Sequence, residues 1–426
     1  MSEATSEAEA IASRITDLSP EKRKRLERWL EEESPQGPSW FVRNPKKTLF
    51  GGAGVILLLL FGLAEYILEK VTPPPPPRRS IRLKEHPPFL DQVIMANRQR
   101  LENQYGLIVD SLEEKAYVFR TDEHGFVMPS KVYDHPDLSL VFLGGSTTEC
   151  TLVDEDSRFP YRAGVLLSQR VNKKVNAYNG GVRGNNSVHS LNILLNKVAP
   201  LHPDIVVLMH NINDVNMLLF AKTYWNNNPT RSALVVTDPR KDRLKRFFTT
   251  TGETLVPGLY YGLELDRLFR GRSKDEFEEE RRTRDIDPST VDKKAFEANL
   301  ITFVNICRAR QMMPVLMTEF SRMSESPDEV TKKNIDKFEA DWGVDYAGYK
   351  GLFDQFNDII RQVARDTGVL LIDLDAQVPK EKTYMFDIVH LNTEGSKLVS
   401  TIVAAGLADS VEAQRLLLRQ NDFMAK

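Results

Sequence analysis

The sequence predicts an α/β domain with a mostly parallel sheet and helices on both faces. Short apolar runs, which are candidate strands, alternate with longer amphipathic stretches. The candidate strands cover residues 138–143, 175–178, 205–209, 314–318 and 369–372, and the candidate helices between them cover 161–171, 187–198, 296–310 and 349–366. In such a sheet, sites lie at the carboxyl ends of the strands.

Composition narrows the class of protein. The chain has 426 residues, of which 41% are hydrophobic and 27% charged, which suffices for one large globular domain with additional segments. Its formal net charge of -3 gives no reason to expect a nucleic-acid partner. The two cysteines, Cys150 and Cys307, are far apart and not in a metal-binding spacing. We therefore expect no metal, no cofactor and no disulfide framework.

The N-terminal part is predicted to carry a membrane helix. Residues 1–47 form a charged segment in which "SPEKRKRLERWLEEE", from Ser19, is typical of a short capped helix. The predicted membrane helix spans residues 48–69, and the stretch "LFGGAGVILLLLFGLAEYIL" within it has the length that a helix needs to cross hydrocarbon. A buried core helix would show a polar stripe, and a cleaved signal peptide fits poorly with 48 preceding residues. We interpret the segment as an uncleaved signal anchor.

The remaining segments follow in order. Residues 70–85, with "PPPPPRR", are predicted to be a stiff Pro-rich linker, residues 86–410 the catalytic domain, and residues 411–426 a C-terminal tail. Residues 217–292, rich in charge and turn formers, are predicted to be an insertion. Basic residues flank the apolar run on both sides, so orientation depends on the additional basic residues upstream of it. They favour a cytoplasmic N-terminus and a periplasmic or other extracytoplasmic catalytic domain.

Polar clusters follow four of the expected elements. They are "GGSTTE" at residues 144–149, "NGGVRGNNS" at 179–187, "HNINDVN" at 210–216 and, before the last helix, "DIVHLNTEGS" at 387–396. A lone Gly-Gly-Ser would more often be a strand-to-helix turn with a capping serine. Four clusters at one sheet edge instead predict a site.

The contents of these clusters match the needs of acyl transfer. A serine hydroxyl needs a base to take its proton, and the base needs a carboxylate to fix its tautomer. Ser146, His390 and Asp387 can fill these roles, because Asp387 lies three residues before His390 and can reach its Nδ1 within one turn. The backbone N–H groups of Ser146 and Gly184 and the Asn213 side-chain amide are candidate oxyanion donors.

The four clusters resemble the four blocks of the SGNH hydrolase superfamily, also called GDSL esterases or lipases. With "RTDEHGFVMP" upstream, they are most similar to its membrane-anchored bacterial "GGSTTE" members. The resemblance implies a flavodoxin-like three-layer α/β/α sandwich, with Ser146 as nucleophile, Asp387 and His390 completing the triad, and Gly184 and Asn213 as oxyanion donors. Two positions depart from the pattern: Gly145 replaces an Asp of many members, and Asn211 replaces a Gly.

The sequence therefore predicts a membrane-anchored serine esterase. Its expected substrate is an ester, with O-acyl groups on envelope glycans or lipids as candidates, and its expected membrane contact is the single helix. Two other functions are compatible with the same residues. An O-acyltransferase would deliver the acyl group to a sugar hydroxyl, and a catalytically degenerate domain would only bind.

Overall fold

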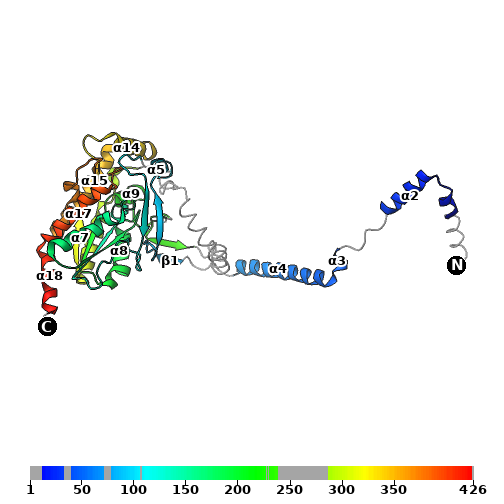
Figure 1. Ribbon diagram of the computed structural model, residues 1–426, viewed down its shortest axis with the longest axis horizontal. Coiled ribbons are helices and arrows are strands. Elements are labelled where there is room, and N and C mark those ends of the chain that lie inside the picture. The colour runs from blue at the N-terminus through cyan, green and yellow to red at the C-terminus, as the bar shows by residue number, and fades with distance from the viewer. Residues whose placement is uncertain are drawn as a thin grey trace. The chain divides into compact units, whose positions relative to one another are not determined.

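The computed structural model describes residues 12–32, 40–71, 78–105, 108–226, 228, 230–237 and 286–424. The chain divides into two compact units, Met1–Pro76 and Pro77–Lys426. Figure 1 labels several helices of both units and the strand β1.

The described residues of the N-terminal unit are mostly helical. It contains α2 (Pro20–Glu32), α3 (Trp40–Arg43) and α4 (Pro45–Val71). Within α4, residues Pro45–Ala64 have a mean hydropathy of 1.9 and are long and apolar enough to cross a membrane. The helix extends beyond both ends of the predicted range of 48–69.

The second unit contains a fully parallel sheet of five strands. Its spatial order is β5-β4-β6-β8-β9, which in chain order reads 2-1-3-4-5, the flavodoxin-like arrangement. The strands are β4 (Leu138–Gly144), β5 (Val175–Gly181), β6 (Ile205–Met209), β8 (Met313–Met317) and β9 (Leu370–Ile372). The predicted fold class is confirmed.

Alternating side chains of these strands enter two hydrophobic cores, one on each face of the sheet. Val206 and Leu208 of β6 pack on one face, whereas Val207 and Met209 pack on the other. The first face is covered by α8 (Ser187–Ile193), α9 (Ile212–Phe220), α13 (Lys293–Ala309) and α15 (Tyr346–Thr367), and the second by α7 (Phe159–Val171) and α17 (Thr393–Ala408). Helices on both faces produce three layers, as Figure 1 shows.

Several shorter elements complete the second unit. They are α6 (Ser146–Glu149), α14 (Glu329–Trp342), α16 (Leu374–Gln377), the 3-10 turns Glu155–Ser157, Ala199–Leu201 and Pro288–Thr290, and the π-helical turn Leu194–Val198. Two antiparallel strand pairs lie outside the main sheet: β1 (Arg78–Ile81) with β7 (Leu234–Thr237), and β2 (Asp91–Met95) with β3 (Ala116–Arg120). Helix α5 (Arg98–Tyr105) connects β2 to the segment before β3.

Two predicted boundaries differ from the structure. The linker predicted over 70–85 overlaps α4 and β1, because Arg78–Ile81 forms backbone hydrogen bonds with β7. The tail predicted over 411–426 contains a helix, α18 (Val411–Met424), which packs on the second core through Ala413, Leu416 and Leu417. These three side chains recur at helical spacing, which makes an amphipathic helix stable against the core. Most of the predicted insertion 217–292 lies outside the described residues.

Candidate active site

The four polar segments meet at the carboxyl edge of the sheet. Strand β4 ends at Gly144, and α6 begins with Ser146. The β5–α8 loop carries Gly184, and the start of α9, directly after β6, carries Asn213. The segment between α16 and α17 carries Asp387 and His390. Parallel strands place these distant segments together, as the alternation of strands and helices predicts.

Ser146, His390 and Asp387 form a continuous hydrogen-bonded series. The Ser146 Oγ lies 2.8 Å from His390 Nε2, and His390 Nδ1 lies 2.7 Å from Asp387 Oδ2. The Asp387 side chain is only 2% exposed, whereas the His390 side chain is 24% exposed. The carboxylate is thus shielded from water while the imidazole can be approached by a substrate.

Local hydrogen bonds fix the turn that carries Asp387 and His390. The Asp387 Oδ1 accepts the N–H groups of Val389, at 2.9 Å, and His390, at 2.7 Å. The Asn392 side chain then caps α17 by accepting the Gly395 N–H at 3.0 Å. With one carboxylate oxygen occupied by the backbone, the other faces the imidazole.

The surroundings shift the pKa values of Asp387 and His390 in opposite directions. Burial by itself would raise the pKa of Asp387, but the charge and hydrogen bond of His390 and the two backbone N–H groups outweigh it and lower that pKa. Burial by itself would lower the pKa of His390, but the charge and hydrogen bond of Asp387 outweigh it and raise that pKa above its usual 6.5. A raised pKa makes the imidazole a stronger base.

The three candidate oxyanion donors also lie in this region. Within the described residues, neither the Ser146 N–H nor the Gly184 N–H donates a hydrogen bond. Gly184 has a φ of +70°, which favours glycine, and an added Cβ would meet the Arg231 guanidinium and the Lys84 Nζ, each at 2.9 Å. Glycine is therefore needed at this position.

Arg231 holds two of the candidate donors and was not predicted from the sequence. Its Nη1 donates to the Asn213 Oδ1 at 2.8 Å and to the Gly184 carbonyl at 2.9 Å. Because the Asn213 side-chain oxygen accepts a hydrogen bond from Arg231, the nitrogen of the same amide faces away from Arg231. An added Cβ on Gly145 would lie 2.4 Å from that nitrogen, so the amide nitrogen lies directly beside the residue before Ser146.

This contact explains why Gly145 suits the site. We expect Gly145→Ala to lower kcat on ester substrates by roughly 100-fold, the usual cost of losing one oxyanion donor. Its φ of −89° is accessible to alanine, so the variant should fold, but the new methyl group must displace the Asn213 amide. Steady-state kinetics and a thermal unfolding curve measure the two effects separately.

Gly351→Ala in α15 is the matched control, because an added Cβ there meets nothing within 4 Å. It should leave kcat unchanged and slightly raise helix stability. Equal activity of Gly145→Ala and wild type would contradict the placement of the Asn213 amide.

A second serine–histidine contact lies inside the domain. Ser190 Oγ lies 2.7 Å from His210 Nε2, and His210 Nδ1 lies 3.7 Å from Asp214 Oδ2. All three residues are buried, and burial lowers the pKa of His210 to about 3. Asp214 accepts the Ser187 N–H at 3.1 Å and the Tyr224 hydroxyl at 2.6 Å, so it connects α9 to the loop of Gly184. These contacts give Asp214 and His210 a structural role inside the domain.

Two buried acids near Ser146, Glu149 and Glu319, were not predicted from the sequence to be part of the site. Glu149 lies 2.7 Å from His86 Nε2 and 3.5 Å from Arg183 Nε. Burial by itself would raise the pKa of Glu149, but Arg183, His86 and Thr151 outweigh burial and lower this pKa to about 2. Glu319 accepts the Ile212 N–H at 3.0 Å, and burial raises its pKa to about 7. Glu149 thereby places Arg183 beside the candidate site, where both residues line the same pocket.

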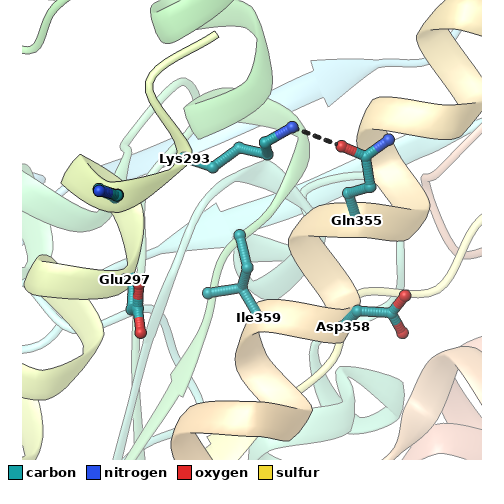
Figure 2. Close-up of a pocket in the computed structure, with 6 residues that line it drawn as sticks. Lys293, Glu297, Gln355, Asp358 and Ile359 are labelled. Atoms are coloured by element: carbon teal, nitrogen blue, oxygen red, sulfur yellow. Dashed lines mark hydrogen bonds between the residues drawn. The ribbon is translucent and has the colours of Figure 1, made fainter. Parts of the chain in front are cut away.

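An apolar pocket opens beside the candidate triad. Its volume is about 190 Å³, and it is lined by Ile94, Leu101, Ser146, Thr147, Glu149, Cys150, Thr151, Leu152, Arg183, Phe386, His390 and Leu391. A different hollow lies between α13 and α15, where Lys293 donates to Gln355 at 2.8 Å (Figure 2). Charged and amide side chains dominate that second hollow, and none of the four polar segments reaches it. The described residues contain no group of three or more side chains arranged to hold a metal.

Comparison with known proteins gives a family match. The model of the GDSL-like lipase/acylhydrolase family matches residues 142–398. No curated protein matches the chain.

Three solved structures illustrate the structural similarity. Acetylxylan esterase Axe2 from Geobacillus stearothermophilus is 16% identical, covering 63% of this chain and 93% of its own, with a TM-score of 0.37. The α/β hydrolase LAE5 from the metagenome of Lake Arreo is 17% identical, covering 64% and 97%, with a TM-score of 0.37. A GDSL-like lipase from Parabacteroides merdae is 13% identical, covering 65% and 98%, with a TM-score of 0.36.

Proposed function

The chain belongs to the GDSL-like lipase/acylhydrolase family and is an ester-hydrolysing enzyme, and we propose that it works through an acyl-enzyme formed on Ser146. The observation that carries this proposal is the series Ser146 Oγ, His390 and Asp387, with contacts of 2.8 and 2.7 Å at the mouth of an apolar pocket. A nucleophile, an oriented base and an accessible cavity are the elements that serine esterases require.

In the proposed first half-reaction, Ser146 Oγ attacks the ester carbonyl carbon while its proton passes to His390 Nε2. The negative charge on the carbonyl oxygen is stabilised by the N–H groups of Ser146 and Gly184 and by the Asn213 amide. Asp387 stabilises the imidazolium. When the tetrahedral intermediate collapses, the C–O bond to the alcohol breaks, and the leaving alkoxide takes the proton from Nε2.

In the second half-reaction, water attacks the acyl-enzyme carbonyl and gives its proton to His390 Nε2. Collapse of this intermediate releases the carboxylic acid and returns the proton to Ser146 Oγ. Apart from the ester and water, the proposed steps use only groups of this chain.

The experiment that tests this function is turnover by the purified full-length chain in detergent on a panel of p-nitrophenyl esters. We expect release of p-nitrophenol in stoichiometric amount with free carboxylic acid. Absence of turnover on every ester would contradict the proposal and favour a domain that only binds. Acylated glycans or lipids of the cell envelope remain the proposed natural substrates.

We also propose that α4 anchors the enzyme in a membrane, with the catalytic unit outside the cytoplasm. The support is the apolar stretch Pro45–Ala64 and the basic residues upstream of it, including Lys22, Arg23, Lys24 and Arg25. An anchored chain stays in the membrane pellet after an alkaline wash, and protease added outside intact spheroplasts removes the catalytic unit. Release by the wash, or full protection from protease, would contradict the anchor or its orientation.

A further inference from the structure

We propose that the pocket beside Ser146 binds a hydrocarbon arm of the substrate, so that the preferred ester carries an apolar group larger than acetyl next to the scissile bond. This inference rests on the proposed function and names its substrate class. The arm belongs either to the acyl group or to the alcohol, since both meet at the carbonyl that Ser146 attacks.

The walls of the pocket carry the argument. Five apolar side chains, Ile94, Leu101, Leu152, Phe386 and Leu391, line a space of about 190 Å³ that Ser146 and His390 also line. Apolar walls stabilise a bound alkyl group in proportion to the area that is removed from water. A sugar ring in the same place would lose hydrogen bonds to water without finding enough polar partners.

The charged side chains of the pocket already have partners. The Glu149 carboxylate, whose side chain is 1% exposed, lies 2.7 Å from His86 and 3.5 Å from Arg183, and it accepts the Thr151 hydroxyl at 2.8 Å. Because Arg183 carries the opposite charge beside this buried carboxylate, Glu149 does not make the pocket a cation site. The apolar side chains therefore decide what binds.

The roof of the pocket comes from outside the part of the chain that the family model matches. Ile94 lies on β2 and Leu101 on α5, whereas the match begins at residue 142. The roof is attached to the His390 segment through a small hydrophobic core that includes Ala96, Leu112, Tyr117 and Phe386. Specificity would then be supplied in part by Ile94 and Leu101, which lie outside the stretch that the family model matches.

A buried arginine fixes the segment of Asp110, which lies between α5 and β3, to the segment before His390. The Arg322 side chain is fully buried and donates two hydrogen bonds to Asp110, at 2.8 and 3.0 Å. It also donates to the Met385 carbonyl at 3.3 Å, and the Asp110 N–H donates to the Phe386 carbonyl at 3.1 Å. A bidentate contact of this kind holds a fixed geometry, so the pocket is a preformed part of the molecule.

The test uses two series of esters with the full-length chain in detergent. In the first series the acyl group grows from acetyl to decanoyl on p-nitrophenol, and in the second an acetyl group is kept while the alcohol grows from methyl to octyl. We expect kcat/KM to rise by about 10-fold or more with chain length in one of the series. The series that shows the rise identifies which side of the ester carries the arm.

Ile94→Trp and Val93→Trp form a matched pair of variants on one strand. Ile94 lines the pocket, whereas the Val93 side chain points away and is 61% exposed. Ile94→Trp should lower kcat/KM for the long ester by about 10-fold or more while that for the shortest ester changes less than about 2-fold. Val93→Trp should change neither. Leu101→Ala, which enlarges the same pocket, should move the optimum to a longer chain.

Two results would overturn the inference while leaving the proposed function intact. One is a preference for the shortest ester in both series. The other is an unchanged chain-length profile in Ile94→Trp and Leu101→Ala, provided that a fluorophosphonate probe still labels Ser146. If no ester is turned over and the probe does not react, the proposed function fails, and the inference fails with it.

Discussion

Replacement of Ser146 by alanine is expected to lower kcat on ester substrates by roughly 10⁵-fold, leaving only the residual rate that the oxyanion donors and substrate binding supply. The Ser146 Oγ is the oxygen within 2.8 Å of His390 Nε2 at the pocket, so its loss removes the attacking atom. The same variant should lose all covalent labelling by a fluorophosphonate probe. Labelling that persists in Ser146→Ala would contradict the assignment.

His390→Ala should cost a similar factor, because a serine without its base is a weak nucleophile. The double variant should be hardly worse than either single variant, since residues that act as a unit are strongly non-additive. Ser190→Ala is the matched control: it breaks the buried contact of 2.7 Å with His210 and should reduce thermal stability rather than kcat. A comparable loss of kcat in Ser190→Ala would mean that the wrong serine had been assigned.

Replacement of Asp387 by asparagine is expected to lower kcat by about 10⁴-fold with little change in fold. The asparagine oxygen can still accept the N–H groups of Val389 and His390, so the turn survives. Its NH2 group would then face His390 Nδ1 and force that nitrogen to accept. The proton of a neutral imidazole would move to Nε2, which could no longer accept the proton of Ser146.

The pH profile provides an independent measurement on the same variant. His390 must be neutral to act as the base, and Asp387 raises its pKa above 6.5. Activity of the wild type should therefore fall as the pH drops through a midpoint above 6.5. In Asp387→Asn the raising charge is gone and burial lowers the pKa, so the midpoint of the residual activity should move to lower pH. A midpoint that does not move would show that another group controls the acid limb.

The fold was predictable because its signals are local and repeated. Each strand of the sheet is a short apolar run, and each run ends in glycine or polar residues, as at Gly144 and His210. Parallel pairing then brings the strand ends to one edge without further information. For the same reason, the contact of Ser146 with the turn of Asp387 and His390 could be predicted from the sequence. Asp387 and His390 are only three residues apart, so their own contact follows from local structure.

Other parts of the site depend on contacts that no local pattern reveals. Arg231 lies in a charge-rich stretch, and only the folded chain places it against Gly184 and Asn213. Ile94 and Leu101 belong to a short strand and a short helix whose apolar residues are indistinguishable, in sequence, from ordinary core positions. A pocket is a property of tertiary packing, and its walls come from segments that the motif does not include.

The distance along the chain between the proposed nucleophile and its proposed base has a consequence for biosynthesis. His390 follows Ser146 by 244 residues, and Asp387 arrives with it. At ordinary elongation rates of about 5–20 residues per second, translation of that interval takes roughly ten seconds to a minute. On the proposed assignment, the nascent Ser146 has no proton acceptor during this time, so the growing chain should not hydrolyse esters. Activity should begin only after the segment of Asp387 and His390 has been made and has folded against the carboxyl edge of the sheet.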